Sequence, residues 1–327
     1  MGRTLTLSVE RFPIAGAFTI SRGSRTEIAV VVATITDGDI VGRGECVPYP
    51  RYGESIESVS ALIAAQADAV TGGITRAELR ERMEAGAARN AIDSALLDWE
   101  CKSQGRRAWD ILGLPAPQPT TTAYTLSLGT PESMGEAARG ASARPLLKVK
   151  LGGDGDPERI AAVRAGAPES RLIVDANEAW RPSNLEANLA ACLDAGVALI
   201  EQPLPAGDDA RLAEIAHPVP VCADESLHDR AGLDALTGRY DAINIKLDKT
   251  GGLTEAVMLA HEARARGLTV MIGCMLGTSL GMAPATLLMH HAEFVDLDGP
   301  LLLARDRDRP LRYEGSTIYP PEPDLWG

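Results

Sequence analysis

Charged residues end a series of short apolar runs in the second half of this 327-residue chain, and they recur at nearly equal spacing. The first run carries two lysines at alternate positions, so both project from the same face of a strand. Subtraction of successive residue numbers from Lys150 to Lys246 gives steps of 25, 26, 23 and 22 residues. A period in the low twenties fits one strand plus one helix, which places the charged residues at the carboxyl ends of parallel strands. In chain order they are Lys148, Lys150, Asp175, Glu201, Asp224 and Lys246.

The three acids in this series predict a metal site. Adjacent strands lie about 4.8 Å apart, so Asp175, Glu201 and Asp224 would be too close for all three to stay ionised without a cation. A ligand set made only of oxygen suits a hard ion, above all Mg²⁺. Capping of the following helix would explain one such acid, but it does not explain three in register between lysines.

The lysines on either side of the acids predict proton transfer. Lys150 precedes the acids by one strand and Lys246 follows them by one strand, so on a round barrel the two face each other across the metal. Removal of a proton from one face of a carbon and its return to the other face require this arrangement. A lysine base must be partly neutral, with a pKa of about 7–8, and Lys148 and Mg²⁺ would lower the pKa. The metal would also stabilise negative charge on a substrate carboxylate.

The elements that must position these residues alternate between residues 116 and 300. Amphipathic helices are expected between the strands, for example at 157–166, 183–195 and 253–266. Seven or eight alternating units predict an α/β fold, a (β/α)7β-type TIM barrel. Strands are expected near 121–126, 146–151, 171–175, 197–201, 219–224, 242–246, 268–272 and 293–296.

Residues 1–115 predict an α+β capping domain. Two polar loops, at about 19–25 and within 42–54, carry arginines and aromatic residues and are expected to cover the barrel mouth, with specificity carried by about 19–25 and 48–55. The Pro- and Arg-rich segment 301–327 is expected to return to this domain. Its strands are expected at 3–12 and 26–36, and its helices at 54–70, 75–85 and 88–104, the last closed by Gly105.

Composition excludes several classes of partner. Asp and Glu number 45 against 32 Lys and Arg, a net charge of −13, so no basic surplus exists for nucleic acid or an anionic membrane. The five cysteines are scattered without a Cys-x-x-Cys pair, which favours reduced thiols and disfavours zinc. Neither a signal peptide nor an apolar run of about 18 residues is present, so a cytoplasmic protein is expected.

The chain resembles the enolase superfamily in its muconate-lactonising subgroup, over essentially its whole length. The resemblance implies an active site with Lys150 and Lys246 as bases, one Mg²⁺ per subunit and an ene-diolate mechanism. It also implies that Asn177, Glu225 and Asp248 support the metal ligands. The motifs that carry it are Lys148-Val149-Lys150, Asp175-Ala176-Asn177, Glu201-Gln202-Pro203, Ala223-Asp224-Glu225-Ser226 and Asn244-Ile245-Lys246-Leu247-Asp248 with Gly251-Gly252.

The substrate is indicated by two acids that follow the last predicted strand. Asp296 and Asp298 point to the same side, and at a barrel mouth they would attract a cation such as a free α-ammonium. An Asp-x-Asp pair at this place resembles the dipeptide epimerases. Segments 22–25, 48–55 and 273–276 look like those of the L-Ala-D/L-Glu epimerases of bacterial murein-peptide recycling.

This closer resemblance implies further contacts with a small-molecule dipeptide. Thr125 and Cys274 match residues that contact the dipeptide in those enzymes. Arg25, or alternatively Arg22, matches an arginine that faces the glutamyl side-chain carboxylate.

Two alternatives remain at this stage. N-acylamino-acid racemisation or o-succinylbenzoate synthesis is disfavoured by Asp296 and Asp298, because an N-acyl group has no ammonium to pair with them. A barrel that binds a ligand without turnover is disfavoured by Lys150 and Lys246, because packing does not require lysines that face each other.

Overall fold

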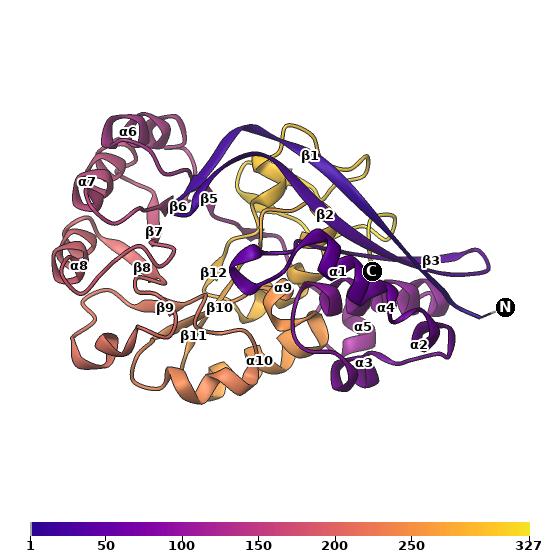
Figure 1. Cartoon of the computed structure of the whole chain (residues 1–327). Helices are drawn as coiled ribbons and strands as arrows, with labels where there is room; N and C mark the ends of the chain where they lie inside the picture. The colour runs from indigo at the N-terminus through magenta and orange to yellow at the C-terminus, as the bar shows by residue number, and fades with distance from the viewer. Residues whose placement is uncertain (1) are drawn as a thin grey trace.

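The computed structural model describes residues 2–327 and begins with a three-stranded antiparallel sheet, β1 (Thr4–Ile20), β2 (Gly23–Asp37) and β3 (Ile40–Cys46) (Figure 1). The polar loop expected at 19–25 is shorter than predicted: only residues 21 and 22 form a turn, and the rest belong to the paired strands at the tip of the β1–β2 hairpin. Thr19 pairs with Ser24 in the antiparallel register, and their hydroxyl groups lie 2.9 Å apart. The hairpin reaches beyond its own domain to the barrel, where Thr19 O accepts a hydrogen bond from Leu128 N at 3.0 Å. Residues 22–25 are exposed, and three of these four are polar, which gives the tip the composition of a loop.

The loop expected at 42–54 is also shorter than predicted, because residues 42–46 belong to β3 and a 3-10 turn, η1 (Pro50–Tyr52), follows. Two glycines in β3 serve close packing against a helix and form no turn. A Cβ at Gly44 would lie 2.7 Å from the Ala95 nitrogen, and one at Gly42 would lie 2.5 Å from the Trp99 nitrogen.

Five helices complete the N-terminal domain. The helix expected at 54–70 is broken at Gln66, whose buried side chain accepts a hydrogen bond from Arg82 at 2.8 Å. Ser55 begins the first helix with a capping box, and Gly105 ends the longest with φ 63°, as expected for a glycine in the left-handed region. The helices are α1 (Ile56–Ala64), α2 (Ala67–Thr71), α3 (Arg76–Arg82), α4 (Ala87–Gln104) and α5 (Ala108–Leu112).

Eight parallel strands follow in chain order and curl into the predicted barrel-like sheet. Ala123 N donates to Val295 O at 2.8 Å and so joins the first strand to the last. The strands are β5 (Tyr124–Leu126), β6 (Leu146–Lys150), β7 (Arg171–Asp175), β8 (Val197–Glu201), β9 (Val221–Ala223), β10 (Ala242–Ile245), β11 (Thr269–Ile272) and β12 (Phe294–Val295). One buried residue from each strand, or from the residue before it, forms an apolar layer: Ala123, Leu146, Ile173, Leu199, Cys222, Ala242, Met271 and Phe294.

Helices and 3-10 turns connect the strands. The α-helices are α6 (Pro131–Gly140), α7 (Asp156–Gly166), α8 (Leu185–Asp194), α9 (Leu247–Thr250), α10 (Leu253–Ala265) and α11 (Ser279–Met282). Strict alternation of strand and α-helix fails after β8 and β9, which are followed by 3-10 turns. Prolines 203 and 205 and Gly207 follow β8 and break a helix there. The 3-10 turns are η2 (Ala210–Glu214), η3 (Arg230–Leu236), η4 (Pro284–His291) and η5 (Gly299–Leu302).

The C-terminal segment lies against the N-terminal domain. Trp326 is fully buried, and its indole nitrogen donates to Ser94 O on α4 at 3.0 Å. On the way, β13 (Tyr313–Glu314) pairs with β14 (Thr317–Ile318), and β14 pairs with β4 (Thr120–Thr121), which overlaps the start of the single strand expected at 121–126. Among residues 2–327, no helix is both long and apolar enough to cross a membrane.

Candidate active site

The carboxyl ends of β6, β7 and β8 bring the first charged residues together. In the parallel register Lys150 is the partner of Asp175, and Asp175 is the partner of Glu201. Alternation along β6 places Leu146 in the apolar layer and directs Lys148 and Lys150 to the same interior face. All of these charged side chains are buried.

Lysine ammonium groups neutralise the carboxylates in this structure. Lys150 Nζ donates to Asp175 Oδ2 at 2.6 Å, and Lys246 Nζ donates to Asp224 Oδ2 at 2.6 Å. Lys148 Nζ lies 2.7 Å from Glu201 Oε2 and 3.3 Å from Asp175 Oδ2. The buried negative charges are therefore compensated by ion pairs from the neighbouring strands.

Two residues that the sequence reasoning did not assign complete this cluster. Lys249 Nζ donates to Asp224 Oδ1 at 2.7 Å and to Asn244 O at 2.9 Å, and its side chain is 1% exposed. Asn244 Nδ2 donates to Glu201 Oε1 at 2.7 Å. Asn244 was visible in the motif before Lys246. Lys249 could have been suspected from its place one turn after Lys246, although a lysine in a short helix is usually exposed.

The pKa values follow from burial and from these partners. Burial raises the pKa of Asp175 and Asp224, but the lysines outweigh it and hold both pKa values below their usual range. Burial, reinforced by Asp175, raises the pKa of Glu201. Burial lowers the pKa of Lys246, but the Asp224 and Glu201 carboxylates outweigh it and raise the pKa well above the ordinary lysine value. A base needs the opposite shift, so Lys246 must leave Asp224 before it can accept a proton.

The three carboxylates are suited to a divalent cation. Glu201 Oε2 is buried without a hydrogen bond, since Lys148 approaches it at ion-pair distance but without hydrogen-bond geometry. Residues 2–327 contain no ready-made group of three or more His, Cys, Asp or Glu that could hold a metal in the conformation seen here. Asp175 and Asp224 would have to turn away from their lysines. The donor set of three adjacent carboxylates nevertheless fits a hard ion such as Mg²⁺.

A cavity lies between the charged cluster and the loops of the N-terminal domain. Both lysines that were predicted as bases line it, and its wall also includes apolar residues of the hairpin. The predicted residues that line it are Arg22, Arg25, Lys150, Asn177, Asp224, Glu225, Lys246 and Cys274. Those that lie outside its lining are Thr125, Lys148, Asp175, Glu201, Asp248, Asp296 and Asp298.

The Asp-x-Asp pair lies buried beside Lys148 and the first strand. Asp296 Oδ2 accepts a hydrogen bond from Lys148 at 2.7 Å, whereas its Oδ1 is buried without a partner among the described residues. Asp298 Oδ2 accepts from Thr125 N at 2.6 Å. Burial, reinforced by Asp296, raises the pKa of Asp298 to about 7. Burial and both aspartates raise the pKa of the Cys274 thiol, which links the pair to the cavity wall.

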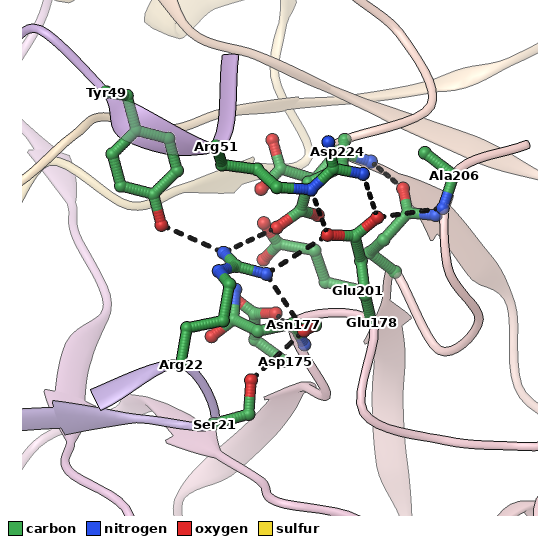
Figure 2. A network of polar contacts seen from close by, with 12 residues as sticks. Ser21, Arg22, Tyr49, Arg51, Asp175, Asn177, Glu178, Glu201, Ala206 and Asp224 are labelled. Carbon is green, nitrogen blue, oxygen red and sulfur yellow. Dashed lines mark hydrogen bonds and ion pairs between the residues drawn. The ribbon is translucent and has the colours of Figure 1, made fainter. Parts of the chain in front are cut away.

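The two arginines of the hairpin tip have different surroundings, and Figure 2 shows those of Arg22. Arg22 donates to Glu225 Oε1 at 2.8 Å, to Tyr49 Oη at 2.9 Å and to Asn177 O at 2.9 Å. Arg25 lines the same cavity and makes no ion pair within residues 2–327. Arg25 is therefore the arginine that remains available to a ligand.

The three residues expected to support the metal ligands each connect parts of the site. Asn177 N donates to Asp175 Oδ1 at 2.9 Å. Burial, reinforced by Asp224, raises the pKa of Glu225 to about 8. Asp248 Oδ1 accepts from Asn90 Nδ2 at 2.9 Å and so joins the barrel to α4, while burial raises its pKa to about 7.

This fold and this arrangement of lysines and carboxylates define an enolase-type protein, and comparison with known families agrees. Residues 3–113 match the mandelate racemase / muconate lactonizing enzyme N-terminal domain, and residues 133–323 match the enolase C-terminal domain-like family. The chain belongs to the mandelate racemase / muconate lactonizing enzyme family, as the sequence motifs predicted.

Individual relatives indicate which members of the family this chain resembles. The L-Ala-D/L-Glu epimerase of Escherichia coli K12 is 48% identical over 319 residues, which cover 97% of this chain and 99% of that protein. The N-acetyl-D-glutamate racemase of a Pseudoalteromonas species is 44% identical over 300 residues, covering 91% and 95%. These relatives are isomerases, and the chain is an enzyme of the same class.

Solved structures similar to this chain are also related to dipeptide epimerases. An enolase family member from Agrobacterium tumefaciens, with homology to dipeptide epimerases and with bound sodium and L-Ala-L-Glu, superposes with a TM-score of 0.98 at 58% identity, covering 99% of this chain and 100% of that one. A dipeptide epimerase from Enterococcus faecalis, complexed with Mg and L-Leu-L-Tyr, has a TM-score of 0.90 at 26% identity, with 98% of each chain covered.

Proposed function

We propose that this enzyme interconverts L-Ala-D-Glu and L-Ala-L-Glu in the recycling of murein peptides. The observation that carries the proposal is the placement of Lys150 and Lys246 in the lining of one cavity, on strands separated by the three carboxylate-bearing strands. Two bases so placed can reach opposite faces of one α-carbon. The similarity to the Escherichia coli L-Ala-D/L-Glu epimerase supports this substrate.

The two lysines carry both proton-transfer steps. A neutral lysine on one side takes the α-proton of the glutamyl residue, and the ammonium on the other side returns a proton to the opposite face. For this to occur, Lys150 must be released from Asp175, and Lys246 from Asp224. One Mg²⁺ per subunit, held by Asp175, Glu201 and Asp224, would supply positive charge opposite the substrate carboxylate.

Specificity is assigned to groups that have unused bonding capacity. Arg25 binds the glutamyl side-chain carboxylate, because the guanidinium of Arg22 is already bonded to Glu225 and Tyr49. Asp296 and Asp298 bind the free ammonium of the first residue. Thr125 and Cys274, which lie beside this pair, contact the dipeptide.

A second candidate is racemisation of an N-acylated glutamate. The Pseudoalteromonas relative, an N-acetyl-D-glutamate racemase, favours it at nearly the same identity as the epimerase. Both substrates present the α-proton and the side-chain carboxylate of glutamate, so Lys150, Lys246 and Arg25 would serve either. Only the dipeptide carries a free ammonium group. The two reactions therefore differ in whether Asp296 and Asp298 bind the substrate.

We also place the reaction in the cytoplasm. The cysteines support this location, because all five are free in the structure and four of them are buried. Buried thiols without disulfide partners suit a reducing compartment.

The test is incorporation of deuterium from D₂O into a dipeptide library and into N-acyl amino acids, read by mass gain and chiral analysis. L-Ala-L-Glu and L-Ala-D-Glu should gain one deuterium at the glutamyl α-carbon and reach the same mixture from either side. If neither dipeptide epimer gains deuterium while N-acyl glutamates do, dipeptide epimerisation is wrong and racemisation of N-acylated glutamate takes its place.

A further inference from the structure

Glu178, in the loop after β7, joins three separate segments at the mouth of the barrel (Figure 2). Arg51, from the turn η1, donates to Glu178 Oε2 from Nε and to Oε1 from a terminal nitrogen, both at 2.7 Å. Arg22, from the hairpin tip, reaches Oε2 at 3.2 Å, and Ala206 N, after β8, donates to Oε1 at 2.8 Å. One carboxylate thus holds both loops that cover the cavity and fastens them to the barrel.

The backbone beside Glu178 takes part in the same attachment. Asn177 and Glu178 have φ values of 44° and 66°, the left-handed region that residues other than glycine seldom adopt. This turn directs Asn177 O toward the hairpin tip, where it accepts hydrogen bonds from Ser21 Oγ at 3.1 Å and from Arg22 at 2.9 Å. Asn177 N donates to Asp175 Oδ1 at 2.9 Å, so the attachment is continuous with the carboxylate cluster.

The two loops line opposite sides of an open groove. Ile20 and Gly23 lie on its hairpin side and Pro50 on the other. The hydrogen bond from Arg22 to Tyr49 Oη crosses it directly at 2.9 Å. A further connection passes through Glu178, whose side chain is 9% exposed and does not line the substrate cavity.

The pairing of β1 with β2 is interrupted below the hairpin tip. The register breaks between Pro13 and Phe18, and Gly16 in that interval has φ 91°. Ile14, in the same interval, is buried and bridges to Leu303, so the C-terminal segment holds this part of β1 where β2 does not. The contacts of the tip with the barrel therefore add to its strand pairing in fixing its position.

We propose that Glu178 is a positioning residue that makes the hairpin tip and the 49–52 turn close over the cavity as one unit. The inference rests on the proposed function, since closure matters only when a substrate is held beneath the loops. Arg51 acts on Arg22 through the shared carboxylate, and Glu178 affects substrate affinity without touching the substrate.

Hydrogen–deuterium exchange of the full-length protein tests the linkage without any substrate. Glu178→Gln keeps the shape of the side chain and removes its charge. Exchange should then rise in both segments, 18–25 and 49–54, and remain unchanged in helix α4. Glu27→Gln is the matched control, because it removes an exposed ion pair with Arg11 from the same hairpin, and it should change neither covering segment. Faster exchange in only one of the two segments would overturn the proposal.

A mutant cycle tests the coupling in the working enzyme. Arg22→Ala and Arg51→Ala should raise KM for L-Ala-L-Glu non-additively in the wild type, and additively in a Glu178→Gln background. Glu178→Gln alone should raise KM about tenfold and change kcat less than about threefold, as expected for loss of a charge-assisted pair that orders loops. Additive effects in both backgrounds would refute the coupling.

The proposal remains testable if Glu178→Gln does not fold or if the proposed function is wrong. If Glu178→Gln fails to fold, Arg51→Ala provides a second test. Both side-chain hydrogen bonds of Arg51 go to Glu178 and none goes to residues 18–25, so faster hydrogen–deuterium exchange in 18–25 would have to pass through Glu178. Unchanged exchange there would overturn the proposal. Failure of the proposed function gives a different result. If the wild type turns over no L-Ala-L-Glu, the proposed substrate is wrong, whereas the hydrogen–deuterium exchange of the variants still tests the linkage through Glu178.

Discussion

Replacement of the substrate ammonium by hydrogen tests the role assigned to Asp296 and Asp298. N-propionyl-L-Glu has the same acyl skeleton as L-Ala-L-Glu and lacks only the charged amino group, so this pair of substrates isolates one contact. It also separates the two candidate reactions, because N-acetyl-D-glutamate is the substrate named for the Pseudoalteromonas relative.

The surroundings of Asp296 set the size of the expected effect. Its Oδ2 accepts from Lys148 at 2.7 Å, and its buried Oδ1 has no hydrogen bond among the described residues. A substrate ammonium would give Oδ1 a charge-assisted hydrogen bond, which contributes about 1.5–3 kcal/mol. Since about 1.4 kcal/mol corresponds to a tenfold rate, kcat/KM should be about 10- to 150-fold higher for L-Ala-L-Glu than for N-propionyl-L-Glu.

The pH dependence of this ratio provides an internal check. Burial, reinforced by Asp296, raises the pKa of Asp298 to about 7. Its carboxyl group therefore takes up a proton as the pH falls through about 7, and a neutral carboxyl attracts an ammonium only weakly. The α-amino group of the dipeptide has a pKa of about 7.7–8.0 and is still mostly charged at about pH 7. The advantage of L-Ala-L-Glu should therefore be larger at about pH 7 to 7.5 than at about pH 6.

Deuterium incorporation at the α-carbon, followed by mass spectrometry, measures both substrates in the same way. Asp298→Asn should lower kcat/KM for L-Ala-L-Glu and leave the value for N-propionyl-L-Glu nearly unchanged. Equal kcat/KM values for the two substrates in the wild type would refute the ammonium site and favour racemisation of N-acylated glutamate.

Three further changes test the metal, the two lysine bases and the packing of β3 against α4. Excess chelator should abolish epimerisation and added Mg²⁺ should restore it, whereas full activity of demonstrably metal-free protein would exclude the metal. Lys246→Ala should stop net epimerisation while Lys150 still exchanges the α-proton of one epimer; a wild-type epimerisation rate would exclude two bases. Gly44→Ala should lower the free energy of unfolding by about 1–3 kcal/mol, because its Cβ would collide with α4. Gly140→Ala, which meets nothing within 4 Å, is the control in chemical denaturation, and equal effects would contradict the packing explanation.

The charged rim was predictable because it depends on a short repeating unit. Each strand of about five residues ends beside its neighbour, so the sequence spacing of Asp175, Glu201 and Asp224 translates directly into proximity. The interior face of Lys148 and Lys150 followed from strand alternation in the same way. The motifs that indicate the family lie on these strands, and the family matches over residues 3–113 and 133–323 confirm it.

Contacts between distant loops could not be predicted from spacing. Arg22, Arg51 and Glu178 belong to a hairpin tip, a 3-10 turn and a strained loop, and their meeting depends on the packing of two domains. The strands of the hairpin extend further than the sequence predicted, because the exposed polar side chains near its tip conceal the strand pairing. Burial of Lys249 likewise depends on how the short helix α9 turns after β10.

The two lysines that hold Asp224 should differ in what they contribute. Lys246 lines the cavity, whereas Lys249 is 1% exposed and donates three hydrogen bonds, to both the carboxylate and main-chain oxygen of Asp224 and to Asn244 O. Lys249→Met would leave two buried carbonyl groups without this donor and Asp224 with one ammonium in place of two.

Removal of one partner from a buried ion pair costs about 3–5 kcal/mol, so Lys249→Met should lower the free energy of unfolding by an amount of this order. Lys246→Met should lower it far less, because Lys249 continues to neutralise Asp224 and the lost side chain faces a cavity. Denaturant titrations of both variants, made with chelator present, measure the difference. Lys246→Met should nevertheless abolish epimerisation, and this separates a lysine that acts on the substrate from one that holds the carboxylate in place. Equal destabilisation by the two substitutions would show that Lys249 has no special structural role.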